Sequence, residues 1–322
     1  MLIYFDTHLG WSELIKRTAK DSIQDDAAGL AAQLAYYFFL SLFPALLFLV
    51  ALASFFPLYN FTDELIRLLG PVAPEAVIGL LQEQLTSLSN SADGGLLSVG
   101  LLMALWSSSA AMVSVIDAMN RAYDIEESRP WWKGRLTAIA LTVGLAVFIL
   151  SAFALIVAGP WLADLLGRQL GLASAFTLTW KILQWPVVFL LASTGFGLVY
   201  YFAPDAEQEW AWITPGAVAA TLLWLLASLA FRFYVVNVGN FEEAYGTLGA
   251  IIMTLLWFYI TGLVMVVGAE LNAEIERASP WVKNQGPKIM GQKKRLGLAA
   301  SREWFRQHPR ESSHKAAGPS PA

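Results

Sequence analysis

The ionisable side chains at the ends of the apolar segments are the residues of this sequence best suited to chemistry. Glu270 and Glu274 lie one helical turn apart and share a face, so they could form part of a cation or proton site or pair with basic residues of another segment. The alternative is that they mark the point where a helix meets water. Arg232 lies inside an apolar stretch and either extends to the membrane interface or faces inward, where it would bind an anion or a carboxylate.

Three aspartates precede the first apolar segment: Asp21, Asp25 and Asp26. They could bind a metal, but acidic groups at the start of a helix also cap it and interact favourably with its dipole, and the sequence favours capping. No zinc-protease, serine-hydrolase or phosphate-loop motif is present. The chain has no cysteine, and its three histidines lie outside the apolar segments. We therefore expect no catalytic residues, no metal site and no cofactor.

The elements that position these side chains are long apolar helices. The composition is 57% hydrophobic and 14% charged, whereas soluble domains are about a quarter charged. A helix needs about 20 apolar residues to cross a bilayer. The sequence predicts an all-α, polytopic membrane protein with six transmembrane helices, at about 35–56, 95–116, 136–159, 182–203, 213–236 and 247–269.

Basic residues predict the orientation of these helices. They precede the first span, fill the loop between the second and third spans, and recur through the C-terminal tail, whereas the opposite loops contain few. Basic loops stay in the cytoplasm. The sequence therefore predicts that both termini are cytoplasmic.

Three segments lie outside the predicted spans, which belong to a helical domain of residues 34–276. Residues 1–33 are expected to form a cytoplasmic segment. Its pattern of apolar and basic residues predicts an amphipathic helix around Trp11, Leu14 and Ile15. The first outside loop, 57–94, predicts a second amphipathic helix. The tail, 277–322, is basic and is expected to be largely disordered and to attract anionic lipid headgroups. Nucleic acid is a less favoured partner for this tail.

Prolines interrupt three of the predicted spans. Pro44 is expected to kink the first span, which also carries Tyr36, Tyr37 and Ser41. Pro186 could do the same in the fourth span. Pro215 is expected at a helix start, where its missing N–H is harmless.

Several short strings occur together in a recognisable order. They are LAYYFFLSLFP from Leu34, AMNRAY from Ala118, RP at Arg129, YFAP from Tyr201, PGA from Pro215, YGTLG from Tyr245, WFY from Trp257 and GAELN from Gly268. This set resembles the YihY/BrkB family of bacterial inner-membrane proteins, over about residues 20–276.

The resemblance implies six membrane helices and offers no catalytic residues. Members have carried the label "ribonuclease BN", which is regarded as a misassignment. The family's motif residues correspond here to Tyr36, Tyr37, Ser41, Pro44, Asn120, Tyr123, Pro204, Gly216, Tyr245, Gly246, Gly249, Gly268, Glu270 and Asn272. Arg232 departs from the residue type expected at its position, which argues against a role in a shared mechanism.

The leading hypothesis is a transporter or permease for a small solute, an ion or a lipid-like molecule. Its path is expected among the first, fifth and sixth spans, with Glu270 near the cytoplasmic mouth. The alternative is a non-transporting scaffold that organises lipids or envelope partners. A ribonuclease or a membrane-embedded hydrolase is the least favoured function. Membrane lipids are expected partners, and self-association into a homo-oligomer is open.

Overall fold

Seven helices make up nearly all of the described structure. The computed structural model describes residues 10–53, 94–170, 173–207, 210–237, 247–278 and 294–295, with the backbone alone in parts of several helices. The helices are α1 (Trp11–Gln24), α2 (Ala27–Ala53), α5 (Gly94–Ala122), α6 (Trp131–Leu170), α7 (Ala173–Phe202), α8 (Trp210–Asn237) and α10 (Thr247–Ala278). Two two-residue strands, β1 (Ala206–Glu207) and β2 (Lys294–Arg295), pair in parallel.

The helical class predicted from the sequence is confirmed in its coarse form. Among the described residues, five helices are long and apolar enough to cross a membrane; they are α5, α6, α7, α8 and α10. The first predicted span, 35–56, overlaps α2. The described apolar stretch of α2, Ala27–Leu42, is shorter than those of the other five helices. Six crossings and the cytoplasmic position of both termini stay predictions. The amphipathic helix expected within 57–94, and almost all of the tail, lie outside the described residues.

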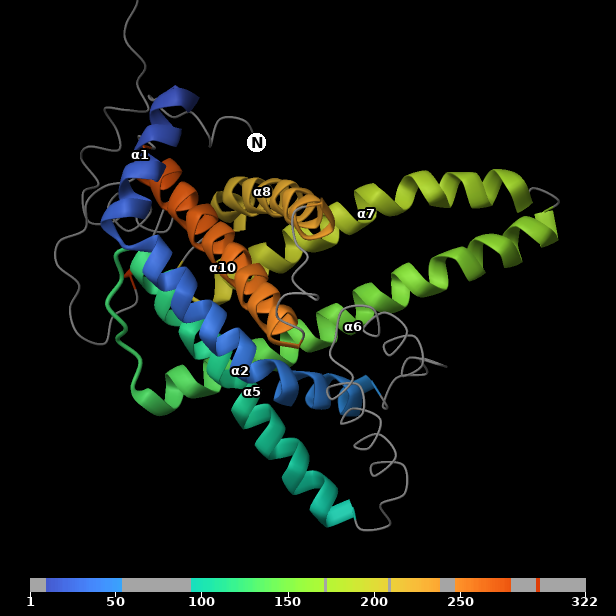
Figure 1. The fold of residues 1–322 in the computed structure, drawn as a ribbon, viewed down its shortest axis with the longest axis horizontal. Coiled ribbons are helices and arrows are strands. Elements are labelled where there is room, and N and C mark those ends of the chain that lie inside the picture. Colours follow the sequence, from blue (N-terminus) through green and yellow to red (C-terminus); the bar gives the residue numbers. More distant parts are fainter. Residues whose placement is uncertain are drawn as a thin grey trace, which may run out of the picture.

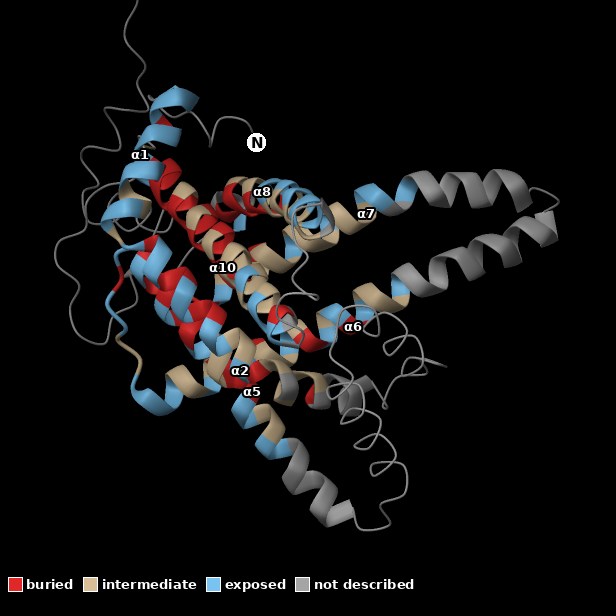
Figure 2. Ribbon diagram, viewed as in Figure 1, coloured by how far each residue is buried: buried red, intermediate tan, exposed pale blue. Residues whose placement is uncertain are grey.

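Helix α10 lies at the centre of the bundle, packed against α1, α2, α5 and α8. Helices α2 and α5 pack against each other, and α6 and α7 run side by side away from the other helices (Figure 1). Buried residues concentrate where α2, α5 and α10 meet (Figure 2). Helices α6 and α7 continue beyond the predicted spans, so residues 160–170 and 173–181 are helical.

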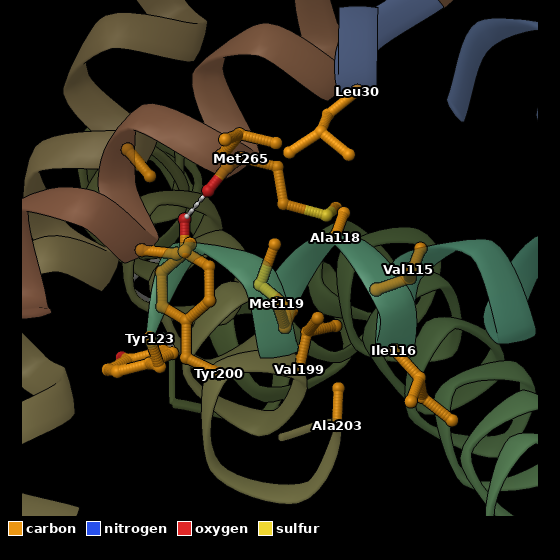
Figure 3. Packing of buried hydrophobic residues seen from close by; sticks show 14 of the residues in the cluster. Leu30, Val115, Ile116, Ala118, Met119, Tyr123, Val199, Tyr200, Ala203 and Met265 are labelled. Atoms are coloured by element: carbon orange, nitrogen blue, oxygen red, sulfur yellow. Dashed lines mark hydrogen bonds between the residues drawn. The ribbon is translucent and has the colours of Figure 1, made fainter. Parts of the chain in front are cut away.

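The buried core joins α5, α7 and α10 (Figure 3). Met119 on α5 and Tyr200 on α7 are both fully buried, and the Tyr200 hydroxyl donates a 2.9 Å hydrogen bond to the Met265 carbonyl on α10. A buried tyrosine needs such a partner for its hydroxyl. This bond therefore fixes α7 against α10.

Small residues allow α8 and α10 to cross closely. A Cβ atom placed on Gly216 would come within 2.3 Å of the Gly268 carbonyl oxygen. One placed on Gly268 would come within 2.7 Å of the Ala220 Cβ. Small residues at such positions are the usual means by which membrane helices approach one another. Gly216 and Gly268, both motif residues, therefore permit the close approach of the two helices.

Two aspartates in left-handed backbone conformations end one helix and begin another. Asp124, with φ 50°, follows α5, and the Ile125 N–H reaches back to the Asn120 carbonyl at 2.8 Å. This is a Schellman ending, in which aspartate takes the place usually held by glycine. Asp26, with φ 54°, separates α1 from α2.

Candidate functional site

Glu270 is a buried acid without a hydrogen-bond partner. It lies on α10, its side chain is 0% exposed, and neither carboxylate oxygen accepts a hydrogen bond from the described residues. Buried polar groups are almost always hydrogen-bonded, and a buried charge without compensation is costly. The charged groups that act on Glu270 are Asp25, within hydrogen-bonding reach, together with Arg277 and Asp21. Glu270 and Asp25 are called the carboxyl pair below.

Arg277 gathers the acidic groups that surround the carboxyl pair. Its Nη1 donates to Asp21 at 2.8 Å and to Glu274 at 2.7 Å, and its Nη2 donates to Asp124. These contacts join α1, α10 and the end of α5. Glu274 is 6% exposed and is thus neutralised by an arginine of its own helix, one turn away. The expectation that Glu274 shares a site with Glu270 holds only in part, since the two acids have different partners.

The three aspartates before α2 have three different roles. The Asp26 carboxylate accepts a 3.2 Å hydrogen bond from the Gly29 N–H and so caps the first turn of α2. Asp21 pairs with Arg277, and Asp25 faces Glu270. The capping role favoured by the sequence is therefore seen for Asp26. Among the residues that the structure describes, no three acidic or histidine side chains are grouped as metal ligands.

A second polar cluster ties the loop after α5 to the end of α7. We call it the loop brace; it consists of Asn120, Glu127, Ser128, Arg129 and Asp205. The Asn120 amide donates to Glu127 at 2.7 Å, and its carbonyl accepts the Asp205 N–H at 2.8 Å. The Asp205 carboxylate accepts hydrogen bonds from the N–H and hydroxyl of Ser128.

Arg129 is the cation of the loop brace. It contacts Glu127 through Nε at 2.6 Å and Nη2 at 2.7 Å, and it also donates to the Ala203 carbonyl at 3.0 Å. Burial alone would raise the pKa of Glu127, but the hydrogen bonds and charge of Arg129 hold that pKa below its ordinary value. Asp205, 0% exposed, lies 3.9 Å from the Arg129 Nε. Arg129 is therefore the cation that faces both acids of the brace, through hydrogen bonds to Glu127 and through charge alone to the Asp205 Oδ1.

Asn272 on α10 forms hydrogen bonds with backbone groups of α8 on either side of Pro215. Helix α8 begins at Trp210, so Pro215 lies inside it, and the expectation that this proline starts the helix is wrong. The Asn272 side chain accepts the Gly216 N–H at 2.7 Å and donates to the Ile213 carbonyl at 3.2 Å. An amide can bond to both of these backbone groups, which lie on either side of Pro215, because it is donor and acceptor at once. The role of Asn272 is thus to hold α8 to α10.

The other predicted site residues are dispersed. Tyr123 is buried beside Asn272 and Glu276, and burial together with the Glu276 charge raises its pKa well above the ordinary value. Ser41 is buried, with its hydroxyl 3.5 Å from the Ser107 carbonyl. Pro44 is half-buried within α2, and Gly249 is buried in α10.

Five more predicted positions lie away from the acidic groups or outside the described residues. Tyr36 and Tyr37 are exposed and meet edge to face, with ring centroids 5.4 Å apart. Tyr245 and Gly246 lie outside the described residues. Arg232 is exposed on α8 and forms no ion pair with the described residues.

One cavity was not predicted from the sequence. It lies between α5 and the start of α6, with a volume of about 370 Å³. Its lining is mostly apolar and aromatic, with charged groups at intervals: Trp106, Val113, Ile116, Asp117, Asn120, Glu127, Arg129, Trp131, Gly134 and Arg135. The spacing of residues 113, 116, 117 and 120 along one helix face is a signal that could have indicated such a lining.

Comparison with known proteins agrees with this architecture. The family model described as "Virulence factor BrkB" matches residues 18–290. The "Putative ribonuclease-like protein YfkH" of Bacillus subtilis is 36% identical over 247 residues, which are 77% of this chain and 89% of that protein. A "UPF0761 membrane protein" of Aliivibrio salmonicida is 27% identical over 267 residues, 81% of this chain and 82% of that protein.

No solved structure matches the chain. The family match covers α2 to α10, including the carboxyl pair and the loop brace. The resemblance predicted from the ordered strings is confirmed, and the chain belongs to the YihY/BrkB family of multi-pass membrane proteins.

Proposed function

We propose that this protein is a permease-like transporter that moves a small solute, an ion or a lipid-like molecule across a bacterial inner membrane. In this proposal both termini are cytoplasmic, so the carboxyl pair lies near the cytoplasmic mouth of the path. The single observation that supports it is Glu270, a fully buried acid without a hydrogen bond from the described residues. Ionisable groups inside membrane helices are costly and commonly mark ion paths and proton relays.

The surroundings of Glu270 suggest what it binds. Two facing carboxylates repel each other unless a proton or a cation lies between them. A proton needs only one oxygen from each acid, whereas the described residues offer no group of three metal ligands. We therefore infer that the carboxyl pair takes up a proton or another small cation during transport.

The experiment is a flux survey with purified protein in proteoliposomes. Proton, monovalent-ion, metabolite and fluorescent-lipid movement would be followed in vesicles with the wild-type chain and in empty vesicles. We expect wild-type vesicles to move one of these classes, and Glu270→Gln to slow that movement at least tenfold because the pair can no longer share a proton. Glu13→Gln is the matched control, since Glu13 is an exposed acid paired with Arg17 on α1.

Two results would count against the proposal. Wild-type vesicles that behave like empty vesicles for every class would remove the transport function. Equal flux in wild type and Glu270→Gln would retain transport but exclude Glu270 from it.

A ribonuclease is the second candidate, because the Bacillus subtilis relative is named ribonuclease-like. A nuclease would have to use the aspartates before α2, but two of them already have structural partners: Asp26 caps α2 and Asp21 pairs with Arg277. Purified protein would be assayed on RNA beside the Asp21, Asp25 and Asp26 triple alanine variant. We expect no cleavage above background in either sample; cleavage by the wild type that the triple variant loses would favour the nuclease.

A further inference from the structure

The cavity between α5 and α6 contains two opposite charges that no neighbour neutralises. Glu127 and Arg129 also line it, but they are bound to each other within the loop brace. The remaining charged groups are Asp117 and Arg135. Neither forms an ion pair with the other or with another described residue. A cavity with apolar walls and few convergent polar groups is the usual form of a ligand site.

Arg135 has a hydrogen-bond donor to spare on the α6 side of the cavity. Its Nη2 donates to the Trp106 carbonyl, and its guanidinium lies over the Trp106 ring, 4.2 Å from the centroid. The Nε–H is shielded from solvent but has no acceptor among the described residues. The stacked ring and the carbonyl hold the guanidinium in place, so its remaining donors suit a phosphate oxygen.

Asp117 supplies the negative charge on the α5 side. It lies within the apolar stretch Leu102–Ala122, and its carboxylate is exposed toward the cavity without a hydrogen bond from the described residues. A carboxylate within a membrane helix is costly unless a partner compensates it. A ligand ammonium group would provide that compensation.

The walls of the cavity indicate the rest of the ligand. The Trp106 and Trp131 rings lie 6.3 Å apart at its edge, and tryptophan is the residue that membrane proteins place at the headgroup level. Beyond them, Leu102 and Met103 on α5 are exposed apolar side chains that can contact acyl chains. The charged groups, the tryptophan rings and the exposed apolar side chains would thus face the headgroup, the interfacial region and the acyl chains of a phospholipid, in that order.

We propose that this cavity binds the headgroup of an amine-bearing glycerophospholipid, with the phosphate at Arg135 and the ammonium at Asp117. The net charge of the site favours a zwitterionic headgroup over an anionic one, because an anionic headgroup satisfies Arg135 and leaves Asp117 opposed to a like charge. The site is independent of the carboxyl pair and of the transport function proposed above.

The test is native mass spectrometry of the full chain, purified and delipidated in detergent micelles. Phosphatidylethanolamine, phosphatidylglycerol, diacylglycerol and soluble glycerophosphoethanolamine would each be titrated. We expect phosphatidylethanolamine to bind best and diacylglycerol worst. If glycerophosphoethanolamine binds as tightly as the whole lipid, the headgroup chemistry holds but its source is a soluble ligand.

Two variants separate the two charges. Arg135→Gln should weaken binding of both phospholipids about tenfold, the scale of one charge-assisted hydrogen bond. Asp117→Asn should weaken phosphatidylethanolamine alone and so abolish the preference between the phospholipids. This ratio is measured on one protein sample and does not depend on how much of the variant folds.

Lys133→Gln is the matched control, because Lys133 is a cation of the same helix turn that lies over the Trp132 ring and does not line the cavity. It should bind both phospholipids like the wild type. The proposal is overturned if the wild type shows no preference between the two phospholipids, if Asp117→Asn keeps that preference, or if Lys133→Gln weakens binding as much as Arg135→Gln.

Discussion

The loop brace joins the end of α5 to the end of α7, whereas the carboxyl pair joins α10 to the turn between α1 and α2, and the two use their polar groups in different ways. In the brace, Asn120 serves one carboxylate and one backbone N–H, and Arg129 neutralises Glu127 while it also reaches Ala203. In the pair, Glu270 is as fully buried as Asp205 of the brace, but neither of its carboxylate oxygens accepts a hydrogen bond from the described residues, whereas one oxygen of Asp205 accepts two from Ser128. Hydrogen-bonded polar networks rigidify a fold, whereas a buried acid without hydrogen bonds needs a proton or a bound cation to compensate it.

This contrast separates residues that hold the structure from residues available for function. If it is correct, removal of a brace residue should lower stability, and removal of the Glu270 charge should leave stability nearly unchanged. The four substitutions below test that division, each by unfolding of the purified protein in detergent micelles.

Arg129→Ala should have the largest effect. It leaves the buried Asp205 and its partner Glu127 without their cation, and loss of one partner of a buried ion pair costs about 3 kcal/mol in the free energy of unfolding. Thermal unfolding followed by circular dichroism measures the loss. Arg121→Ala, at an exposed position of α5, is the control and should unfold like the wild type. Equal stability of Arg129→Ala and the control would show that the brace does not support the fold.

Asn272→Ala tests whether other polar residues of α10 behave like the brace. The variant frees the Gly216 N–H and the Ile213 carbonyl, which are buried between α8 and α10. Each unsatisfied buried group costs free energy, and we expect a loss of about 2 kcal/mol after partial relaxation. Chemical denaturation would measure it. An unchanged midpoint would mean that water replaces the amide and that Asn272 is free for another role.

Glu270→Gln should change stability by less than about 1 kcal/mol, because glutamine has nearly the size of glutamate and its amide can donate to Asp25 within the same reach. The same thermal scan as for Arg129→Ala gives a direct comparison. A destabilisation equal to that of Arg129→Ala would contradict the division of roles, since Glu270 would then be a structural residue.

Glu127→Gln should lower stability only slightly at neutral pH, because glutamine keeps an oxygen that can accept from Arg129, and its clearest effect should be on the pH dependence of unfolding. Arg129 lowers the folded-state pKa of Glu127 below its value of 4.5 in the unfolded chain, against the effect of burial. The stabilisation is therefore complete above pH 4.5 and is lost as the pH falls through the lowered folded-state pKa. Melting temperatures between pH 6 and pH 3 should fall less steeply for Glu127→Gln than for the wild type. Parallel curves would show that Glu127 does not contribute to acid sensitivity.

The helices could be predicted from the sequence because their signal is strong and local. Long apolar runs exceed the span of a bilayer, and such runs identified α5, α6, α7, α8 and α10. The capping role of Asp26 was also accessible, since it depends on residues three positions apart. The family strings that contain Asn120, Glu270 and Asn272 directed attention to residues that the fold indeed buries.

The partners of those residues could not be predicted, because they come from distant parts of the chain. Nothing in the order of residues indicates that Arg277 meets Asp21, or that Asp205 meets Ser128 across the bundle. Pro215 was misplaced for a related reason. A proline inside a membrane helix is tolerated when a neighbouring helix serves the freed backbone groups, and Asn272 does so from α10.

The close crossing of α8 and α10 also limits which sequences can keep this fold. A single added methyl group at Gly216 or Gly268 meets backbone or side-chain atoms at less than 3 Å and would force the two helices apart. Glu270 follows Gly268 by two residues on the same helix, so the close packing that these glycines permit lies next to the carboxyl pair. Descendants of this sequence that enlarge either glycine should be found only with a compensating loss of bulk on the facing helix.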